Sequence, residues 1–60
     1  MTVRAVLKLL RDDGWFVHDQ AGSHIQLKHP LKKGRVTIPN HKGDLKRGTL
    51  HSVLKQAGLE

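Results

Sequence analysis

Among the residues suited to acid–base chemistry, one of the five histidines, His24, stands out by its setting. It follows a glycine turn in the stretch GSHIQLKHP at 22–30. An imidazole can take up a proton and return it near neutral pH. In RNA the available proton is on the 2′-hydroxyl, and its removal creates an internal nucleophile against the adjacent phosphate. Since this reaction needs neither a metal ion nor a bound water, His24 is the candidate catalytic residue.

The stretch after the turn reads as a half-buried strand that displays polar groups on one face. Because side chains alternate along a strand, Gln26 and Lys28 should share a face with His24. Ile25 and Leu27 should point the other way, into a small core. An imidazole, an amide and an ammonium group would then lie in a row on an open face.

A further strand brings a second cation to this face. Pairing Leu27 with Val36 sets Lys28 directly opposite Arg35. Like charges that face each other destabilise a sheet, so the arrangement makes better sense with an anion between them. The two cations would also stabilise charge that develops on phosphoryl oxygens. Gln26, Lys28 and Arg35 are therefore candidate RNA-binding residues.

The other histidines give weaker signals. They have neither the H-x-x-x-H spacing nor carboxylates at ligand spacing, so we predict no metal site and no cofactor. His41 and His51 are expected to be surface residues, and a surface or capping role is also the alternative for His24. A three-residue loop at 20–22 would put His18 opposite His24, where it could carry a second proton or tune His24 by like-charge repulsion.

Composition favours a polyanionic partner. Eleven Lys and Arg stand against five Asp and Glu, a formal charge of +6. This charge fits nucleic acid, an anionic membrane or an acidic protein, and the alternative is a soluble basic protein without such a partner. There is no cysteine, which excludes disulfides and thiolate metal sites. Without a targeting or membrane-spanning segment, the expected location is the cytoplasm.

A helix is predicted at each end of the chain. Met1–Asp13 has Thr2 as N-cap, Gly14 as a positive-φ end, and one apolar stripe: Val3, Val6, Leu7 and Leu10. Its basic stripe is either a solvated face or a set of phosphate contacts: Arg4, Lys8 and Arg11. Lys46–Ala57 has Asp44 as candidate N-cap and a second apolar stripe: Leu50, Val53, Leu54 and Ala57.

Three strands are predicted between the helices. They cover 15–19, 24–28 and 35–38, with Trp15 and Val17 directed inward and Phe16 outward. Only one layering buries all the apolar stripes together: a three-stranded antiparallel sheet with both helices on one face. We therefore predict an α+β fold of α-β-β-β-α order, in one domain over 1–60.

Four segments together resemble the HicA toxin family, also called YcfA-like. They are DGW at 13–15, GSHIQLKHP at 22–30, VTIP at 36–39 and DLKRGTLHSVLKQAGL at 44–59. The resemblance implies a double-stranded-RNA-binding-like fold and an mRNA interferase activity, that is, a small ribonuclease that cuts transcripts and halts growth. It also implies a HicB antitoxin that blocks the active site, and a toxin that is monomeric when free of antitoxin.

The resemblance assigns roles to the glycine turn. The family's catalytic histidine falls on His24 and its turn residues on Gly22 and Ser23. Ser23 either hydrogen-bonds a phosphate or simply caps the turn. The chain departs from the family at Ile25, where a second histidine is common, and at Leu27, where an aromatic residue is common.

The start of the second helix is a further candidate RNA contact. Lys46, Arg47 and Thr49 lie where free backbone N–H groups and the helix dipole attract anions, and in this fold that end faces phosphates. The alternative is a solvated helix start, and Lys46 replaces a proline common in the family. Two other functions stay open: a non-catalytic double-stranded-RNA-binding module, and a module that binds an acidic protein.

Overall fold

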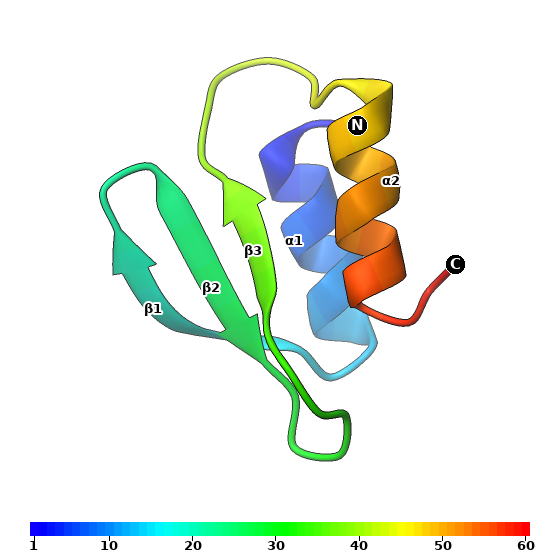
Figure 1. Ribbon diagram of the computed structural model, residues 1–60. Helices are drawn as coiled ribbons and strands as arrows, with labels where there is room; N and C mark the ends of the chain where they lie inside the picture. Colours follow the sequence, from blue (N-terminus) through cyan, green and yellow to red (C-terminus); the bar gives the residue numbers. More distant parts are fainter.

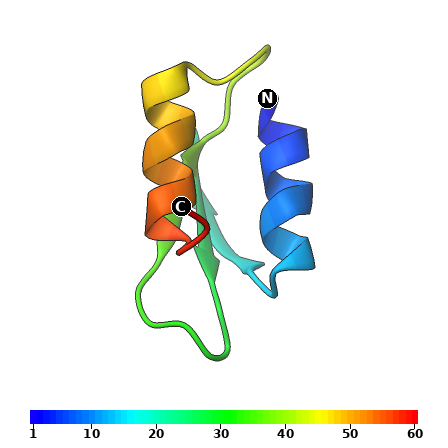
Figure 2. The same cartoon turned by 90° about the vertical axis from the view of Figure 1, so that its right-hand side faces the viewer.

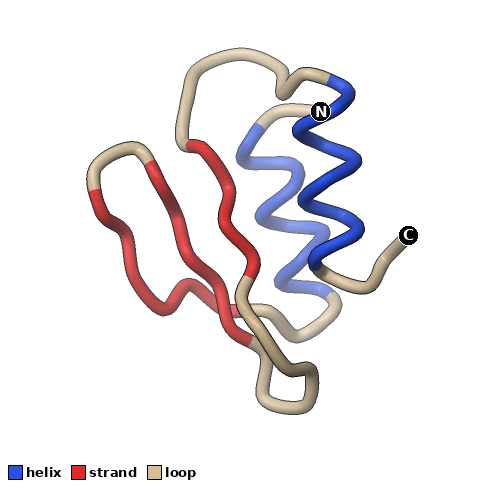
Figure 3. Tube along the Cα trace, viewed as in Figure 1, coloured by secondary structure: helices blue, strands red, loops and turns tan.

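The computed structural model describes residues 1–60 and has two helices and three strands (Figures 1 and 3). In chain order these are α1 Val3–Asp12, β1 Phe16–Ala21, β2 His24–Lys28, β3 Val36–Pro39 and α2 Arg47–Gln56. The strands form one antiparallel sheet in the order β1-β2-β3. The predicted α-β-β-β-α order is confirmed.

Both helices cover the same face of the sheet (Figure 2), and the other face carries no layer. The core between them holds 11 apolar residues, to which β1 contributes none. They are Val3, Val6, Leu10, Trp15, Ile25, Leu27, Val36, Ile38, Leu45, Val53 and Ala57. No polar or charged side chain is buried, so functional groups lie at the surface.

Helix α1 begins and ends as its sequence predicts. The Thr2 hydroxyl accepts a hydrogen bond from the Ala5 N–H at 3.1 Å, which satisfies one free amide of the first turn. The chain leaves the helix through Gly14, whose φ of 104° is a backbone conformation that residues with a side chain rarely adopt. A Cβ at Gly14 would also lie 2.6 Å from the His29 Nε2 atom, so glycine is required there on two grounds.

The β1–β2 hairpin has a shorter turn than predicted. It consists of Gly22 and Ser23 only, with Gly22 at φ 57° and no positive φ at Ser23, as in a type II′ turn. Val17 therefore pairs with Leu27, whereas the three-residue loop had paired it with Ile25. The predicted register of this hairpin is wrong, although the glycine itself is correctly placed.

His18 is the extra residue of a β-bulge in β1. The register shifts between the pairs Val17–Leu27 and Asp19–Gln26, and this leaves His18 without a cross-strand partner. The residue opposite His24 on β1 is Ala21. The prediction that His18 faces His24 is wrong, because it assumed regular pairing from a longer loop.

The β2–β3 pairing agrees with prediction. Ile25 pairs with Ile38 and Leu27 with Val36, and all four side chains are buried against the helices. Val17, by contrast, is 39% exposed although it pairs with buried Leu27, because β1 is an edge strand. The central strand β2 therefore presents a fully buried face on one side and the polar residues on the other.

Helix α2 starts later than predicted, and its cap is different. Lys46 is the N-cap and supplies no side-chain hydrogen bond. Asp44, the predicted cap, instead forms a β-bridge with Thr2, and its carboxylate lies 3.9 Å from the N-terminal ammonium group. Leu45 donates its N–H to the Met1 carbonyl at 2.8 Å, so the starts of α1 and α2 are tied together. Neither helix has the length and apolar character that crossing a membrane requires.

Candidate functional site

His24 lies at the start of β2 on the uncovered face of the sheet. Its neighbour Ile25 is 5% exposed on the helix side, whereas His24 itself is exposed. Ala21 and Pro39, the residues beside it on the adjacent strands, carry no charge and no side-chain donor. The imidazole makes no hydrogen bond or ion pair within the chain, so both ring nitrogens are free for a ligand.

The turn that precedes His24 is held from the neighbouring loop. The Asn40 N–H donates to the Ser23 carbonyl at 2.6 Å and thus joins the β1–β2 turn to the segment that follows β3. The Ser23 hydroxyl makes no hydrogen bond in the turn, which does not support the capping interpretation. This hydroxyl is therefore available next to His24.

The predicted polar row beside His24 is present. Gln26 and Lys28 follow it on the open face, and Arg35 comes directly before β3. The Arg35 Nη1 group donates to the Gln26 Oε1 atom at 3.2 Å, which brings the guanidinium over β2. Neither Lys28 nor Arg35 forms an ion pair, so two uncompensated cations share this face.

The cations of α2 lie on the other side of the sheet from this row. Lys46 and Arg47 belong to the helix layer, and both are exposed. The first hydrogen bond within the helix runs from the Leu50 N–H to the Lys46 carbonyl, at 2.9 Å. The amides of Arg47, Gly48 and Thr49 therefore point out of the helix end without a partner in the chain. The sequence-predicted residues thus fall into two groups, one on the open face of the sheet and one at the start of α2.

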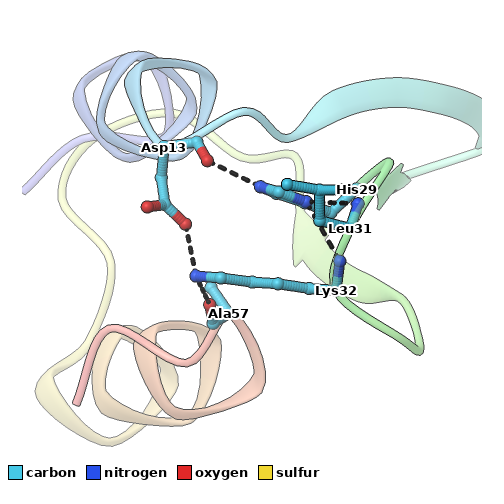
Figure 4. A network of polar contacts seen from close by, with 5 residues as sticks. All are labelled: Asp13, His29, Leu31, Lys32 and Ala57. Carbon is cyan, nitrogen blue, oxygen red and sulfur yellow. Dashed lines mark hydrogen bonds and ion pairs between the residues drawn. The ribbon is translucent and has the colours of Figure 1, made fainter.

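A polar network at the opposite end of the molecule was not predicted (Figure 4). The His29 Nδ1 atom accepts the backbone N–H groups of Leu31 and Lys32, at 3.0 and 3.1 Å. Its Nε2 atom lies 2.6 Å from the Asp13 carbonyl oxygen. An acceptor role at Nδ1 requires the proton on Nε2, which then donates to that carbonyl, so the geometry assigns a neutral ring.

Lys32 completes this network. Its ammonium group donates to the Asp13 carboxylate at 2.5 Å and to the Ala57 carbonyl at 3.0 Å. The hydrogen bond from Lys32 is the main reason that the pKa of Asp13 lies below its ordinary value, and the charge of Lys32 acts in the same direction. The network joins the ends of both helices to the β2–β3 turn and is a structural clasp. The sequence did not predict it, because its contacts with Asp13 and Ala57 join residues that are 16 to 25 positions apart.

No three histidine or carboxylate side chains lie close enough together to hold a metal ion.

A comparison with protein families finds a match over residues 3–59 to the model described as the HicA toxin of bacterial toxin–antitoxin systems. A comparison with curated proteins finds no match. The family match covers nearly the whole chain, and it includes the Gly22–Ser23 turn, His24 and both helices.

Proposed function

Because the chain belongs to the HicA toxin family of bacterial toxin–antitoxin systems, we propose that it is an mRNA interferase, an endoribonuclease in which His24 is the general acid–base group. The observation that carries this proposal is the exposed His24 imidazole, which is free of any partner in the chain and shares the open sheet face with two unpaired cations. The activity, the role of His24 and the RNA substrate are parts of the proposal.

The chemical step uses the substrate's own nucleophile. His24 accepts the proton of a ribose 2′-hydroxyl, and the oxygen attacks the adjacent phosphorus. The P–O5′ bond breaks and the leaving oxygen takes up a proton from water, because attacking and leaving oxygens lie on opposite sides of phosphorus. His24 then gives its proton to the hydroxide that this leaves, which restores the neutral base. The products are a 2′,3′-cyclic phosphate and a 5′-hydroxyl, and a positioned base of this kind contributes about 10²–10⁴-fold in rate.

The open face supplies charge for this step. The phosphoryl oxygens gain negative charge in the transition state, and Lys28 and Arg35 are the cations on the same face as His24. The hydrogen bond from Arg35 to Gln26 restricts the guanidinium before RNA binds, which lowers the entropy cost of positioning it. Gly22 sets the turn, and the free Ser23 hydroxyl is placed to bind a phosphate oxygen.

The start of α2 adds a second set of phosphate contacts. Three backbone amides without partners, together with Lys46 and Arg47, make this end of the helix attractive to anions. We assign Lys46, Arg47 and Thr49 to the RNA strand that flanks the cleaved bond.

The partner that neutralises the toxin is proposed to be a HicB-like antitoxin. A protein that covers the exposed imidazole prevents RNA from reaching it, and an acidic surface would match the net charge of +6. In this proposal the free toxin is a cytoplasmic monomer.

The test is cleavage of a single-stranded RNA in EDTA by the wild type, His24→Ala and His51→Ala. His51 is an exposed histidine of α2 whose ring pairs with the Glu60 carboxylate, away from the open sheet face, so it controls for the loss of an imidazole. We expect the wild type and His51→Ala to leave cyclic phosphate ends, and His24→Ala to be at least about 100-fold slower. Equal rates for His24→Ala and the wild type, or wild-type cleavage that EDTA abolishes, would refute the proposal. RNA that is bound but never cut would instead indicate a non-catalytic RNA-binding module.

A further inference from the structure

The surface along α1 contains a groove that the proposed site does not use. One side carries the basic stripe of the helix, Arg4, Lys8 and Arg11. The other side is formed by the loop after β3, through Asn40 and His41. Figure 2 shows this loop reaching toward the start of α1.

The cations of this groove are spaced along one line. Arg4, Lys8 and Arg11 are four and three residues apart, so they extend over about 10 Å of the helix axis. Lys8 is neutralised by Asp12 at 3.3 Å, whereas Arg4 and Arg11 have no carboxylate partner. All three side chains are exposed, so the groove presents two free guanidinium groups to solvent.

The groove and the proposed catalytic turn are linked through one residue of the loop after β3. Asn40, which lines it, is the residue whose N–H holds the Ser23 carbonyl at 2.6 Å, and His24 follows Ser23. The bridge between Thr2 and Asp44 ties the same loop to the start of α1, and Lys46 comes two residues later. The loop after β3 thus lines the groove, is hydrogen-bonded to the turn and continues into the start of α2.

We propose that this groove binds the sugar–phosphate backbone of the RNA that flanks the cleaved bond, with Arg4 and Arg11 as the phosphate-binding residues. The inference rests on the proposed function and extends the site from the turn onto α1. The guanidinium groups match phosphate oxygens in charge and hydrogen-bond geometry. The apolar side chains Val3 and Leu7, which also line the groove, offer a surface for ribose C–H groups. The competing occupant is an acidic segment of the antitoxin. If that segment is the occupant, RNA affinity will not depend on these arginines.

The test uses a 2′-O-methyl oligoribonucleotide, which cannot be cleaved by 2′-hydroxyl attack, as a single strand and as a duplex. Affinity is measured between 50 and 200 mM salt for the wild type, for Arg4→Gln/Arg11→Gln and for Lys33→Gln/Lys55→Gln. The last is the matched control, because it also removes two exposed positive charges, from the β2–β3 turn and from the end of α2. Circular dichroism verifies that each variant is folded.

We expect Arg4→Gln/Arg11→Gln to bind the tighter of the two probes about five- to tenfold more weakly than the control at 50 mM salt. The slope of log affinity against log salt should fall in magnitude by about 1.4 for the single strand, or by about 1.8 for the duplex. The same variant should cleave RNA with a raised KM and an unchanged kcat. Affinity and slope equal to those of Lys33→Gln/Lys55→Gln would overturn the inference. Because the probe is not cleaved, this result is independent of His24: a His24→Ala enzyme that cleaves normally would refute the proposed function and leave the groove measurement intact.

Discussion

Replacing His29 by alanine should destabilise the fold strongly, although the residue is far from the candidate site. The substitution removes the donor to the Asp13 carbonyl and the acceptor of the Leu31 and Lys32 N–H groups. It also removes an edge contact with the Trp15 ring, whose centroid lies 5.2 Å away. Two of the three hydrogen bonds are partly buried, and their loss leaves backbone groups with reduced access to water.

The size of the effect follows from these contacts. At about 0.5–1 kcal/mol for each of the three hydrogen bonds and a similar value for the ring contact, the loss is about 2–4 kcal/mol. A chain of 60 residues is expected to have only about 3–9 kcal/mol of unfolding free energy. The variant should therefore lose a large share of its stability, and its Tm should fall by roughly 10–30 °C.

Thermal unfolding followed by circular dichroism, and urea unfolding followed by Trp15 fluorescence, measure this loss. His41→Ala is the control, since the ring of His41 contacts only the adjacent Lys42 carbonyl and its removal should cost less than about 0.5 kcal/mol. Nitrogen NMR of the wild type should show the His29 ring with its proton on Nε2. A proton on Nδ1, or a His29→Ala variant as stable as His41→Ala, would show that the clasp does not support the fold as argued.

Two further predictions concern the same clasp. Asp13→Asn keeps the backbone carbonyl but loses the carboxylate. Because the folded-state pKa of Asp13 is lowered, the carboxylate's contribution to the free energy of unfolding is fully present above the ordinary pKa of 3.8. This contribution disappears as the pH falls through the lower folded-state pKa. The stability difference between wild type and variant, measured by urea unfolding from pH 7 to 2, should thus be constant at neutral pH and vanish in acid; a difference that grows in acid would contradict this. Gly14→Ala should cost about 1–3 kcal/mol from the backbone at φ 104°, plus the clash with the His29 ring. In a His29→Ala background the clash is absent, so the cost of Gly14→Ala should be smaller there, and equal costs in the two backgrounds would exclude the clash.

Helix α1 and the central strand β2 were predictable because the pattern that specifies each lies within its own residues. The apolar stripe of α1 and the Thr2 cap lie within one element, and the alternation along β2 fixes its buried face without reference to the rest of the chain. The start of α2 was not predictable in this way. Asp44 has the side chain of a good N-cap, but its backbone is engaged in the bridge to Thr2, 42 positions earlier in the chain, and a contact at that separation leaves no local pattern.

The candidate site was predictable to the extent that it depends on β2 alone. His24, Gln26 and Lys28 were correctly placed on the open face because a strand's alternation does not depend on its partners. Their relation to α1 was not predictable, because the groove arises from the loop after β3, whose path follows from the contacts of Asn40 with Ser23 and of Leu45 with Met1. The basic stripe of α1 was visible in the sequence, but nothing there indicated that it shares a groove with the loop that is hydrogen-bonded to the Ser23 turn.

The fold was predicted correctly although the register of the β1–β2 hairpin was not. The predicted pairing of His18 with His24, by contrast, depended on that register. A regular ladder from the two-residue turn would pair Val17 with Lys28 and direct Trp15 to the open face, away from the core. The bulge at His18 adds one residue and restores the parity, so Trp15 is 2% exposed in the core and Phe16 lies outside beside Lys28. Burial of a large indole is worth about 2–3 kcal/mol, which exceeds the cost of one unpaired residue at an edge strand. Burial of Trp15 in the core therefore favours the bulge. His18 makes no core contact, so it is the residue that loses its cross-strand partner. A proton relay between two histidines cannot rest on such a position, and the proposed mechanism therefore uses His24 without His18.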